Sequence, residues 1–283
     1  MIAQKITVAA GISPPLSGQR SPLVASTGSF VEGRIGAFFE WFGNLGIFSW
    51  QVVRAAVTPP FEFRELFRQL DEIGSMSMPL VALAGAATGV VLSLEARFSL
   101  TRFGAKSLLP AAIVFSVIHE TGPIITGLVV SGRVGAGIGA ELASMKVTEQ
   151  IDAIEASAVN PYRLLAAPRI LACILMLPLL TLAGDFCGVL MGWVAQALVE
   201  PQSLHQFISA GFNGADFNDF LPPTLKTAVF GLIIGLIACF QGMRTRGGAA
   251  GVGRAATSSV VLSSLFVILA DVVLVKIIIL FFP

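Results

Sequence analysis

The amino-acid sequence predicts an all-α integral membrane protein, and three observations carry that prediction. Of the 283 residues, 55% are hydrophobic and only 12% are charged, about half the charged fraction of an average soluble domain. Several apolar runs reach or exceed the ~20 residues that a helix needs to cross a ~30 Å hydrocarbon core. These runs are continuous, whereas the strands of a membrane β-barrel would alternate apolar and polar residues. The net charge of +1 gives no reason to expect a nucleic-acid partner.

The N-terminal region divides into a tail and a helix. Residues 1–29 are expected to form a flexible tail, because Pro, Ser and Gly interrupt a weakly apolar stretch that lacks a clear signal-peptide cleavage site. Residues 30–283 are expected to form a single membrane domain that begins with a helix over 30–57. Five apolar residues there recur at helical spacing, Ile35, Phe38, Phe39, Phe42 and Leu45, with polar residues between them. With Trp41 and Trp50 this pattern favours an amphipathic helix in the membrane interface, and a true span is the alternative.

Five transmembrane helices are predicted after Pro59 and Pro60 end that first helix. Their expected ranges are 76–94, 108–142, 164–198, 221–240 and 260–282. The second run is too long for one straight crossing and contains Gly122-Pro123, so either a kinked or a broken helix fits it. Pro168 and Pro178 are expected to kink the third.

The segments between the spans indicate how the chain is oriented. A polar amphipathic stretch at 61–73, a polar island at 143–161 and a basic glycine-rich loop at 242–253 lie on one side. The loop at 200–219 lies opposite, lacks Lys and Arg, and holds enough aromatic residues for a short surface helix. The distribution of Lys and Arg places the N-terminus, the polar island and the glycine-rich loop in the cytoplasm, although Arg97, Arg102 and Lys106 make the first outer loop basic too.

Five ionisable residues lie inside the apolar runs: Glu120, Arg133, Glu141, Asp185 and Asp271. Each costs at least ~2.5 kcal/mol near the centre of a bilayer, so each should face a cavity or a partner group. One interpretation is a path for a substrate or for protons. The other is internal pairing that fixes helix packing, for example between Glu120 and Arg133.

Small residues cluster around and after Arg133, at Gly132, Gly135, Ala136, Gly137, Gly139 and Ala140. Their spacing allows a second helix to approach closely, either within the chain or across a subunit interface.

The sequence lacks the usual motifs of several nucleotide-binding, metal and catalytic sites. There is no GxxxxGK[ST] phosphate loop, no HExxH and no GxSxG, and His119 and His205 stand apart. A GxGxxA match at 251–256 follows a membrane span instead of a strand, so it does not indicate a dinucleotide site. Cys173, Cys187 and Cys239 lie in apolar runs and are expected to pack helices. The sequence therefore favours a non-catalytic membrane protein without a bound cofactor or metal.

The polar island holds a short amphipathic helix. Val147, Ile151 and Ile154 share one face, while Glu149, Asp152 and Glu155 form an acidic stripe on another, with Thr148 as a plausible cap. Such a helix suits docking into a groove of a soluble protein, and covering the ends of the spans is the alternative.

These segments together resemble the MlaE/YrbE family of ABC-transporter permeases. The similarity rests on His119-Glu120-Thr121-Gly122-Pro123, Val130 to Ala136, Ala140-Glu141-Leu142, Met145 to Ile154 and Asn160-Pro161 to Pro168-Arg169. It continues in Gly247 to Thr257, Val260-Val261 and Asp271, and covers roughly residue 38 to the end. His119 departs from the family, because many relatives carry arginine at that position.

The resemblance implies a homodimer in the bacterial inner membrane, with a cytoplasmic N-terminus, that moves phospholipid to or from a periplasmic ring of MCE-domain protein. This activity would serve the lipid asymmetry of the outer membrane. ATP and Mg would be bound by a separate cytoplasmic ABC ATPase dimer. The helix at 147–157 would be the coupling helix, contacting that ATPase through Lys146, Thr148, Glu149, Gln150, Asp152 and Glu155.

The resemblance also suggests which residues would serve the cargo. A lipid cavity would be lined by Leu94, Arg97, His119, Glu120 and Arg133, and structural glycines would be Gly122, Gly132, Gly135, Gly251 and Gly253. The alternative function is a proton-coupled secondary transporter that uses the intramembrane carboxylates Glu120, Asp185 or Asp271.

Overall fold

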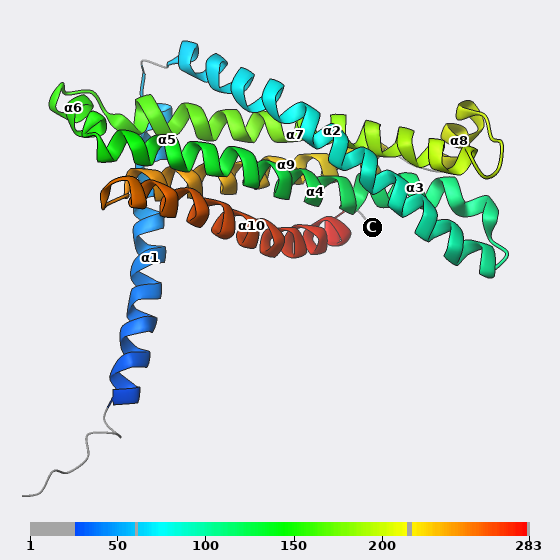
Figure 1. The fold of residues 1–283 in the computed structure, drawn as a ribbon, viewed down its shortest axis with the longest axis horizontal. Helices are drawn as coiled ribbons and strands as arrows, with labels where there is room; N and C mark the ends of the chain where they lie inside the picture. The colour runs from blue at the N-terminus through cyan, green and yellow to red at the C-terminus, as the bar shows by residue number, and fades with distance from the viewer. Residues whose placement is uncertain (1–25, 60–61, 214–216, 282–283) are drawn as a thin grey trace, which may run out of the picture. The chain divides into compact units, whose positions relative to one another are not determined.

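The computed structural model describes residues 26–59, 62–213 and 217–281. The chain is 90% helical, with no strand among these residues. Five of its helices are long and apolar enough to cross a membrane (Figure 1). The predicted fold class of an all-α membrane protein with five spans is confirmed.

The first helix, α1 (Ser26–Val57), corresponds to the predicted helix at 30–57. It is not among the five candidate spans in the described part of the chain, and its position in a membrane interface stays a prediction. The first 25 residues of the predicted tail lie outside the described residues. The chain divides after Ile47 into two compact units, and the second, 48–283, contains all five spans.

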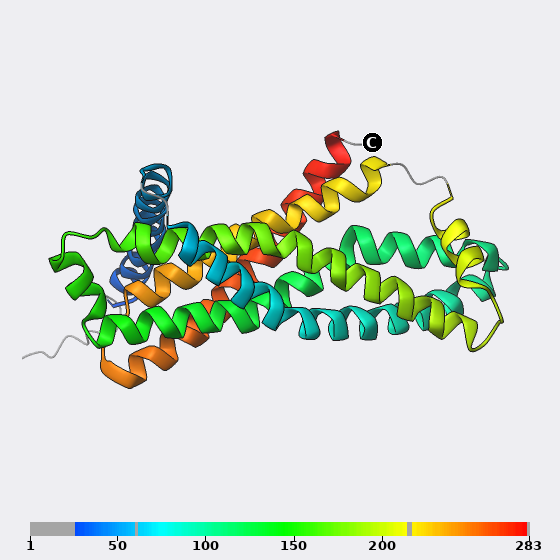
Figure 2. The ribbon, with the colours of Figure 1, turned by 90° about the horizontal axis from the view of Figure 1, so that it is seen from above.

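The five spans are helical over longer ranges than their apolar runs. They are α2 (Phe63–Arg102), a composite helix (Lys106–Val147), η4 (Tyr162–Ala166) continuing into α7 (Ala167–Ala197), α9 (Phe217–Met243) and α10 (Gly248–Phe281). Two short helices connect them, α6 (Gln150–Ala156) and α8 (Leu204–Gly211). In both views of the second unit α6 lies at one end of the bundle and α8 at the other (Figures 1 and 2).

Two helices begin earlier than the predicted spans. The polar amphipathic stretch at 61–73 is helical from Phe63 and forms the first turns of α2, and the predicted glycine-rich loop at 242–253 gives way to α10 at Gly248. Hydropathy marks where a helix enters lipid, whereas the backbone stays helical until a residue interrupts it. With 40 residues at 1.5 Å each, α2 is ~60 Å long, so its ends extend beyond a ~30 Å hydrocarbon core.

The composite helix resolves the alternatives for the run around Gly122-Pro123. It is continuous over 42 residues and consists of η1 (Lys106–Leu108), α3 (Leu109–Ser116), η2 (Val117–Thr121), α4 (Gly122–Val130), η3 (Ser131–Gly135) and α5 (Ala136–Val147). The turns η2 and η3 are π-helical. Pro123 lies at the start of α4, immediately after the first of these wide turns. The chain therefore changes its helical pitch there instead of breaking.

Glycines set the contact between α2 and α7, which pack against each other along much of their length. A Cβ atom added to Gly85 would overlap the carbonyl of Gly184, and one added to Gly89 would overlap the carbonyl of Gly188. The two backbones thus touch directly, as small residues permit in membrane helices.

We expect Gly89→Ala to destabilise the fold by about 1–3 kcal/mol, because the added methyl group must push α2 away from α7. Gly253→Ala is the matched control, since Gly253 is exposed in α10 and no atom lies within 4 Å of the Cβ it would gain. Unfolding of both variants in mixed micelles with increasing denaturing detergent measures the difference. Equal stability of the two variants would contradict the direct backbone contact.

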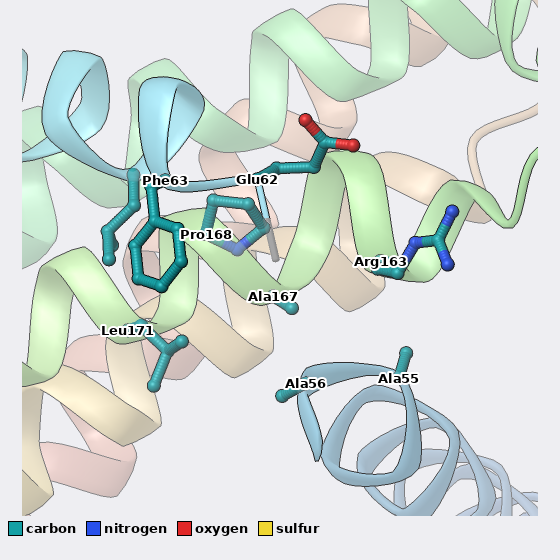
Figure 3. A pocket seen from close by; sticks show the side chains of 9 residues that line it. Ala55, Ala56, Glu62, Phe63, Arg163, Ala167, Pro168 and Leu171 are labelled. Atoms are coloured by element: carbon teal, nitrogen blue, oxygen red, sulfur yellow. The ribbon is translucent and has the colours of Figure 1, made fainter. Parts of the chain in front are cut away.

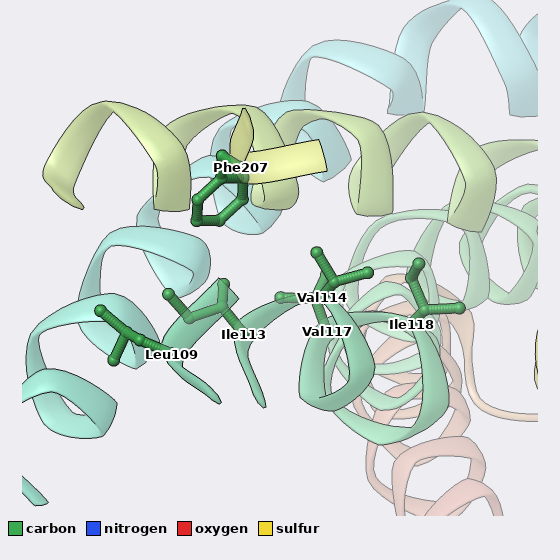
Figure 4. Packing of buried hydrophobic residues seen from close by; sticks show 6 residues of the cluster. All are labelled: Leu109, Ile113, Val114, Val117, Ile118 and Phe207. Atoms are coloured by element: carbon green, nitrogen blue, oxygen red, sulfur yellow. The ribbon is translucent and has the colours of Figure 1, made fainter. Parts of the chain in front are cut away.

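The end of the bundle opposite α6 is held by α8. A capping box between Ser203 and Gln206 starts this helix, and its Phe207 is fully buried against α3 and η2 (Figure 4). The packing partners are Leu109, Ile113, Val114, Val117 and Ile118. The short surface helix predicted in the 200–219 loop is confirmed.

A charged clasp ties the same end together. Glu200, after α7, accepts from Lys106 at 2.8 Å and from Arg97 at 3.1 Å, which joins α7 to α2 and η1. The hydrogen bond from Lys106 holds the pKa of Glu200 below its ordinary value of 4.5. A carboxyl group whose pKa is lower in the folded than in the unfolded chain stabilises the fold above the unfolded pKa, and that contribution is lost as the pH falls through the lowered value.

We therefore expect the clasp to be intact at pH 7 and to weaken as the pH falls below 4.5, the ordinary pKa of a glutamate. Hydrogen exchange of the peptide covering residues 198–211 should be slower in the unaltered chain than in Glu200→Gln at pH 7, and the difference should shrink as the pH is lowered to 3. Glu95→Gln removes a carboxyl group from the same end of α2 without touching the clasp and should exchange like the unaltered chain. A difference that persists unchanged at pH 3 would contradict the assignment.

Candidate functional site

A buried ammonium group lies at the centre of the bundle. Lys226 on α9 is 1% exposed, and its Nζ lies 2.9 Å from Asp271 Oδ1 on α10 and 3.1 Å from Glu120 Oε2 on η2. Asp271 is almost as buried as Lys226, whereas half of the Glu120 side chain is exposed. The cluster thus connects two buried groups to one carboxylate that remains accessible.

Asp185 on α7 lies close to this cluster. Its side chain is buried, and neither carboxylate oxygen has a hydrogen-bond partner among the described residues. Oδ1 packs directly against Gly122, where any Cβ atom would overlap it. Gly122 is therefore required here because the carboxyl group of Asp185 occupies the space beside its Cα atom.

An open cavity of about 450 Å³ lies beside the exposed carboxylate of Glu120. One wall is α2, with Leu92, Glu95, Ala96 and Ser99, and the other is the composite helix, with Phe115, Ser116, His119, Glu120 and Thr121. The His119 ring stacks on Phe115, with ring centroids 3.8 Å apart. We call this the outer cavity, because it lies on the half of α2 nearer the clasp.

A second cavity of about 200 Å³ lies between the same two helices on the half nearer α6. Its lining includes Gln69, Glu72 and Ile73 of α2 and Arg133, Gly137 and Glu141 of the composite helix. Arg133 donates to Ser77 Oγ at 2.7 Å and to the Glu72 carbonyl at 3.4 Å, and Glu141 accepts from the buried Arg169 at 2.8 Å. We call this the inner cavity.

The residues predicted to line one lipid cavity lie at different sites in the structure. His119 and Glu120 line the outer cavity, and Arg133 lines the inner one. Leu94 is exposed on α2 and lines neither cavity, and Arg97 points to Glu200 and Gln196 instead. The two cavities nevertheless share one seam, between α2 and the composite helix.

The pairing suggested between Glu120 and Arg133 is wrong, because Glu120 pairs with Lys226 and Arg133 with Ser77. Sequence analysis missed Lys226 as an intramembrane charge and did not count Arg169 among the ionisable residues of the apolar runs, although Arg169 is buried in α7. The available signal was a single lysine inside the apolar run at 221–240, which needs a carboxylate at the same depth.

The polar island forms the short helix predicted there. The helix is α6 (Gln150–Ala156), preceded by Glu149 in a left-handed conformation (φ 60°). Ile151 is buried, while Glu149, Gln150, Asp152 and Glu155 are exposed. The predicted cap at Thr148 is wrong: Thr148 ends α5, and its hydroxyl donates to the Ser144 carbonyl at 2.8 Å. Lys146 forms an ion pair with Asp152, which orients the acidic face of α6.

The proposed structural glycines differ in their surroundings. Gly251, like Gly122, is tightly packed, because a Cβ atom there would overlap the carbonyl of Arg246. A Cβ on Gly135 would make ordinary contacts, and no atom lies within 4 Å of one on Gly132 or Gly253. Contacts within the described chain therefore require glycine only at the first two positions. Among the described residues no group of His, Cys, Asp and Glu could hold a metal ion.

Five spans, a buried charge cluster and two cavities along one seam define a multi-pass helical membrane protein with space between its spans. Comparison with known proteins identifies its family. The family model for Permease MlaE matches residues 66–277, so the chain belongs to the MlaE permease family.

Several relatives cover most of the chain. A probable ABC transporter permease protein of Rickettsia felis is 37% identical over 83% of this chain and 90% of its own length. A probable ABC transporter permease protein of Synechocystis is 32% identical over 74% of this chain and 79% of its own. The chloroplastic protein TRIGALACTOSYLDIACYLGLYCEROL 1 of Arabidopsis thaliana is 31% identical over 83% of this chain and 68% of its own. The chain is thus an ABC transporter permease.

Substituting Lys226 tests the charge cluster. We expect Lys226→Met to cost about 3–5 kcal/mol of stability, because it leaves Asp271 buried without a counter-ion. Glu120→Gln should cost less, since that side chain is half exposed. Unfolding in mixed micelles measures both.

The double variant Lys226→Met with Asp271→Leu is the control, because it removes both buried charges and leaves only the half-exposed Glu120 unpaired, so it should recover much of the loss. A Lys226→Met protein as stable as the unaltered chain would show that the cluster does not hold the helices together.

Proposed function

We propose that this chain is the membrane subunit of an ATP-driven lipid transporter, in which two copies join a cytoplasmic ABC ATPase dimer. An ABC permease implies an ATPase partner, and this chain has no phosphate loop of its own. The observation that carries the cargo assignment is the seam between α2 and the composite helix, with ionised side chains at two depths and apolar walls between them. A ligand with a polar head and an apolar body matches that distribution.

The relatives support a lipid as the cargo. The Arabidopsis relative is named for trigalactosyldiacylglycerol, a lipid. For this chain we propose phospholipid, delivered to or received from a periplasmic MCE-domain protein. The seam would then offer Arg133 to the phosphate while the lipid headgroup lies in the inner cavity, and Glu120 to a headgroup amine while it lies in the outer cavity.

The proposed orientation places α6 and the N-terminus in the cytoplasm of a bacterial inner membrane. Basic residues collect at the α6 end, where Arg163, Arg244, Arg246 and Arg254 lie near the ends of their helices. The clasp and α8 would then face the periplasm. The exposed glycines Gly132 and Gly137 on the composite helix leave room for a close approach by the second copy.

Force would enter this subunit through α6. The acidic face of Glu149, Asp152 and Glu155 is exposed and follows directly on the composite helix. A shift of α6 in an ATPase groove would pass through α5 to the turns η3 and η2 and alter the seam where Arg133 and Glu120 lie. ATP and Mg would remain in the partner, and the permease would hold no cofactor.

A co-purification followed by reconstitution tests this function. Gentle extraction from the native membrane should recover an ATPase and an MCE-domain protein with this chain, with phospholipid bound. In proteoliposomes, we expect Glu155→Arg to lower ATP-driven lipid transfer at least tenfold, because it reverses an exposed charge of the docking face without breaking an ion pair of the chain. Asp71→Arg, an equal charge reversal on an exposed site of α2, is the control and should transfer lipid normally.

The competing function is proton-coupled transport, favoured by the carboxylates around Lys226. It predicts transfer that needs a proton gradient and no ATPase. Recovery of the chain without any nucleotide-binding partner, with transfer driven by a gradient alone, would replace our proposal by this one. Full transfer by Glu155→Arg would reject α6 as the docking helix.

A further inference from the structure

A third cavity lies away from the seam, at the α6 end of the second unit (Figure 3). It measures about 290 Å³ and is bounded by the end of α1, the start of α2 and the first turns of η4 and α7. Its walls are mostly apolar, with Ala55, Phe63, Pro168 and Leu171 among them. None of its lining residues belongs to the outer or inner cavity.

Two opposite charges stand among these apolar walls. Arg163 and Glu62 both line the cavity, and Figure 3 shows their charged groups at separate positions along it. Neither side chain forms a hydrogen bond or ion pair with another described residue, and Nε of Arg163 is buried without a partner. A buried guanidinium nitrogen without an acceptor is costly. The site therefore favours binding of an anion, because no described residue supplies an acceptor to Arg163.

Arg163 and the apolar Leu171 are separated along the axis of the third span. Arg163 lies in η4, at the end of the span next to α6, and Leu171 follows eight residues later in α7. At 1.5 Å per residue, Leu171 lies about 12 Å deeper along the helix axis. The cavity thus offers charge near the membrane surface and apolar contact toward the membrane interior.

We propose that this cavity binds one resident glycerophospholipid of the surrounding leaflet whose headgroup carries both a phosphate and a primary ammonium. The phosphate accepts from Arg163, the ammonium donates to Glu62, and part of one acyl chain lies against Pro168, Leu171 and Phe63. An anionic headgroup without an amine would meet the Glu62 carboxylate unfavourably, and a quaternary amine would have no hydrogen to donate to it.

This lipid is distinct from the transported cargo, because the cavity is not part of the seam. It would fill the space between the end of α1 and α7. The inference goes beyond the proposed function and requires neither ATP nor a partner protein, so the two can fail separately.

Photo-crosslinking on the purified full chain tests the proposal. Three probes with the same diazirine-labelled acyl chain are incorporated in nanodiscs, with phosphoethanolamine, phosphoglycerol or phosphocholine headgroups. We expect the phosphoethanolamine probe to label peptides containing residues 163–171 or 55–66, with yields several-fold above the other two. This comparison uses the unaltered chain and does not depend on any variant folding.

Substitutions then test whether Arg163 binds the phosphate and Glu62 binds the ammonium group. Arg163→Gln should lower labelling of these peptides about tenfold, the usual range for a charge-assisted hydrogen bond, and Arg163→Lys should keep most of it. Glu62→Gln should remove the preference for phosphoethanolamine over phosphoglycerol. Arg54→Gln is the matched control, because Arg54 is an exposed cation on α1 that does not line the cavity.

Three results would overturn the proposal: no labelling of these peptides, equal labelling by all three headgroups, or unchanged labelling in Arg163→Gln. Loss of ATP-driven transfer with labelling intact would instead count against the transport function alone.

Discussion

A lysine buried within the membrane is the constraint on which the arrangement of this bundle depends. An ionised side chain at the bilayer centre costs at least ~2.5 kcal/mol, and Lys226 has almost no exposure through which to reach water. Its ammonium group is satisfied only where α9, α10 and η2 converge, because Asp271 and Glu120 come from the other two elements. Any packing that separates these three helices leaves a charge unpaired in hydrocarbon.

The close approach of the helices follows from small residues placed where backbones meet. Gly85 and Gly89 allow α2 to touch α7, and Gly122 makes room for the carboxyl group of Asp185. These contacts bring α7 against the composite helix at the turn that carries Glu120. The polar cluster and the glycine contacts therefore support each other: the first specifies which helices meet, and the second sets how near they come.

Sequence alone predicted the number of spans, the helix after α5 and the helix in the outer loop, because apolar length, proline and amphipathic spacing are local signals. It failed to predict contacts between residues that are far apart in the sequence. Arg133 was the nearest basic residue to Glu120 along the chain, yet thirteen positions on a helix separate them by about 20 Å. Lys226 is a hundred residues away in sequence and lies at 3.1 Å. Helix ends were also misplaced, since hydropathy reports contact with lipid and not the extent of hydrogen bonding.

Three π-helical turns lie at the outer cavity, the inner cavity and the cavity at the α6 end. Among the described residues the turns are η2, η3 and η4, and each carries a charged side chain that lines a different cavity, Glu120, Arg133 or Arg163. A π turn inserts one residue into the helix, which loosens its hydrogen bonding and redirects the side chains around it. Two of these turns, η2 and η3, lie within the composite helix, which ends beside α6. A movement of α6 would therefore be absorbed at η3 and η2, where Arg133 and Glu120 lie, and under the proposed function these are the side chains that would hold a lipid headgroup.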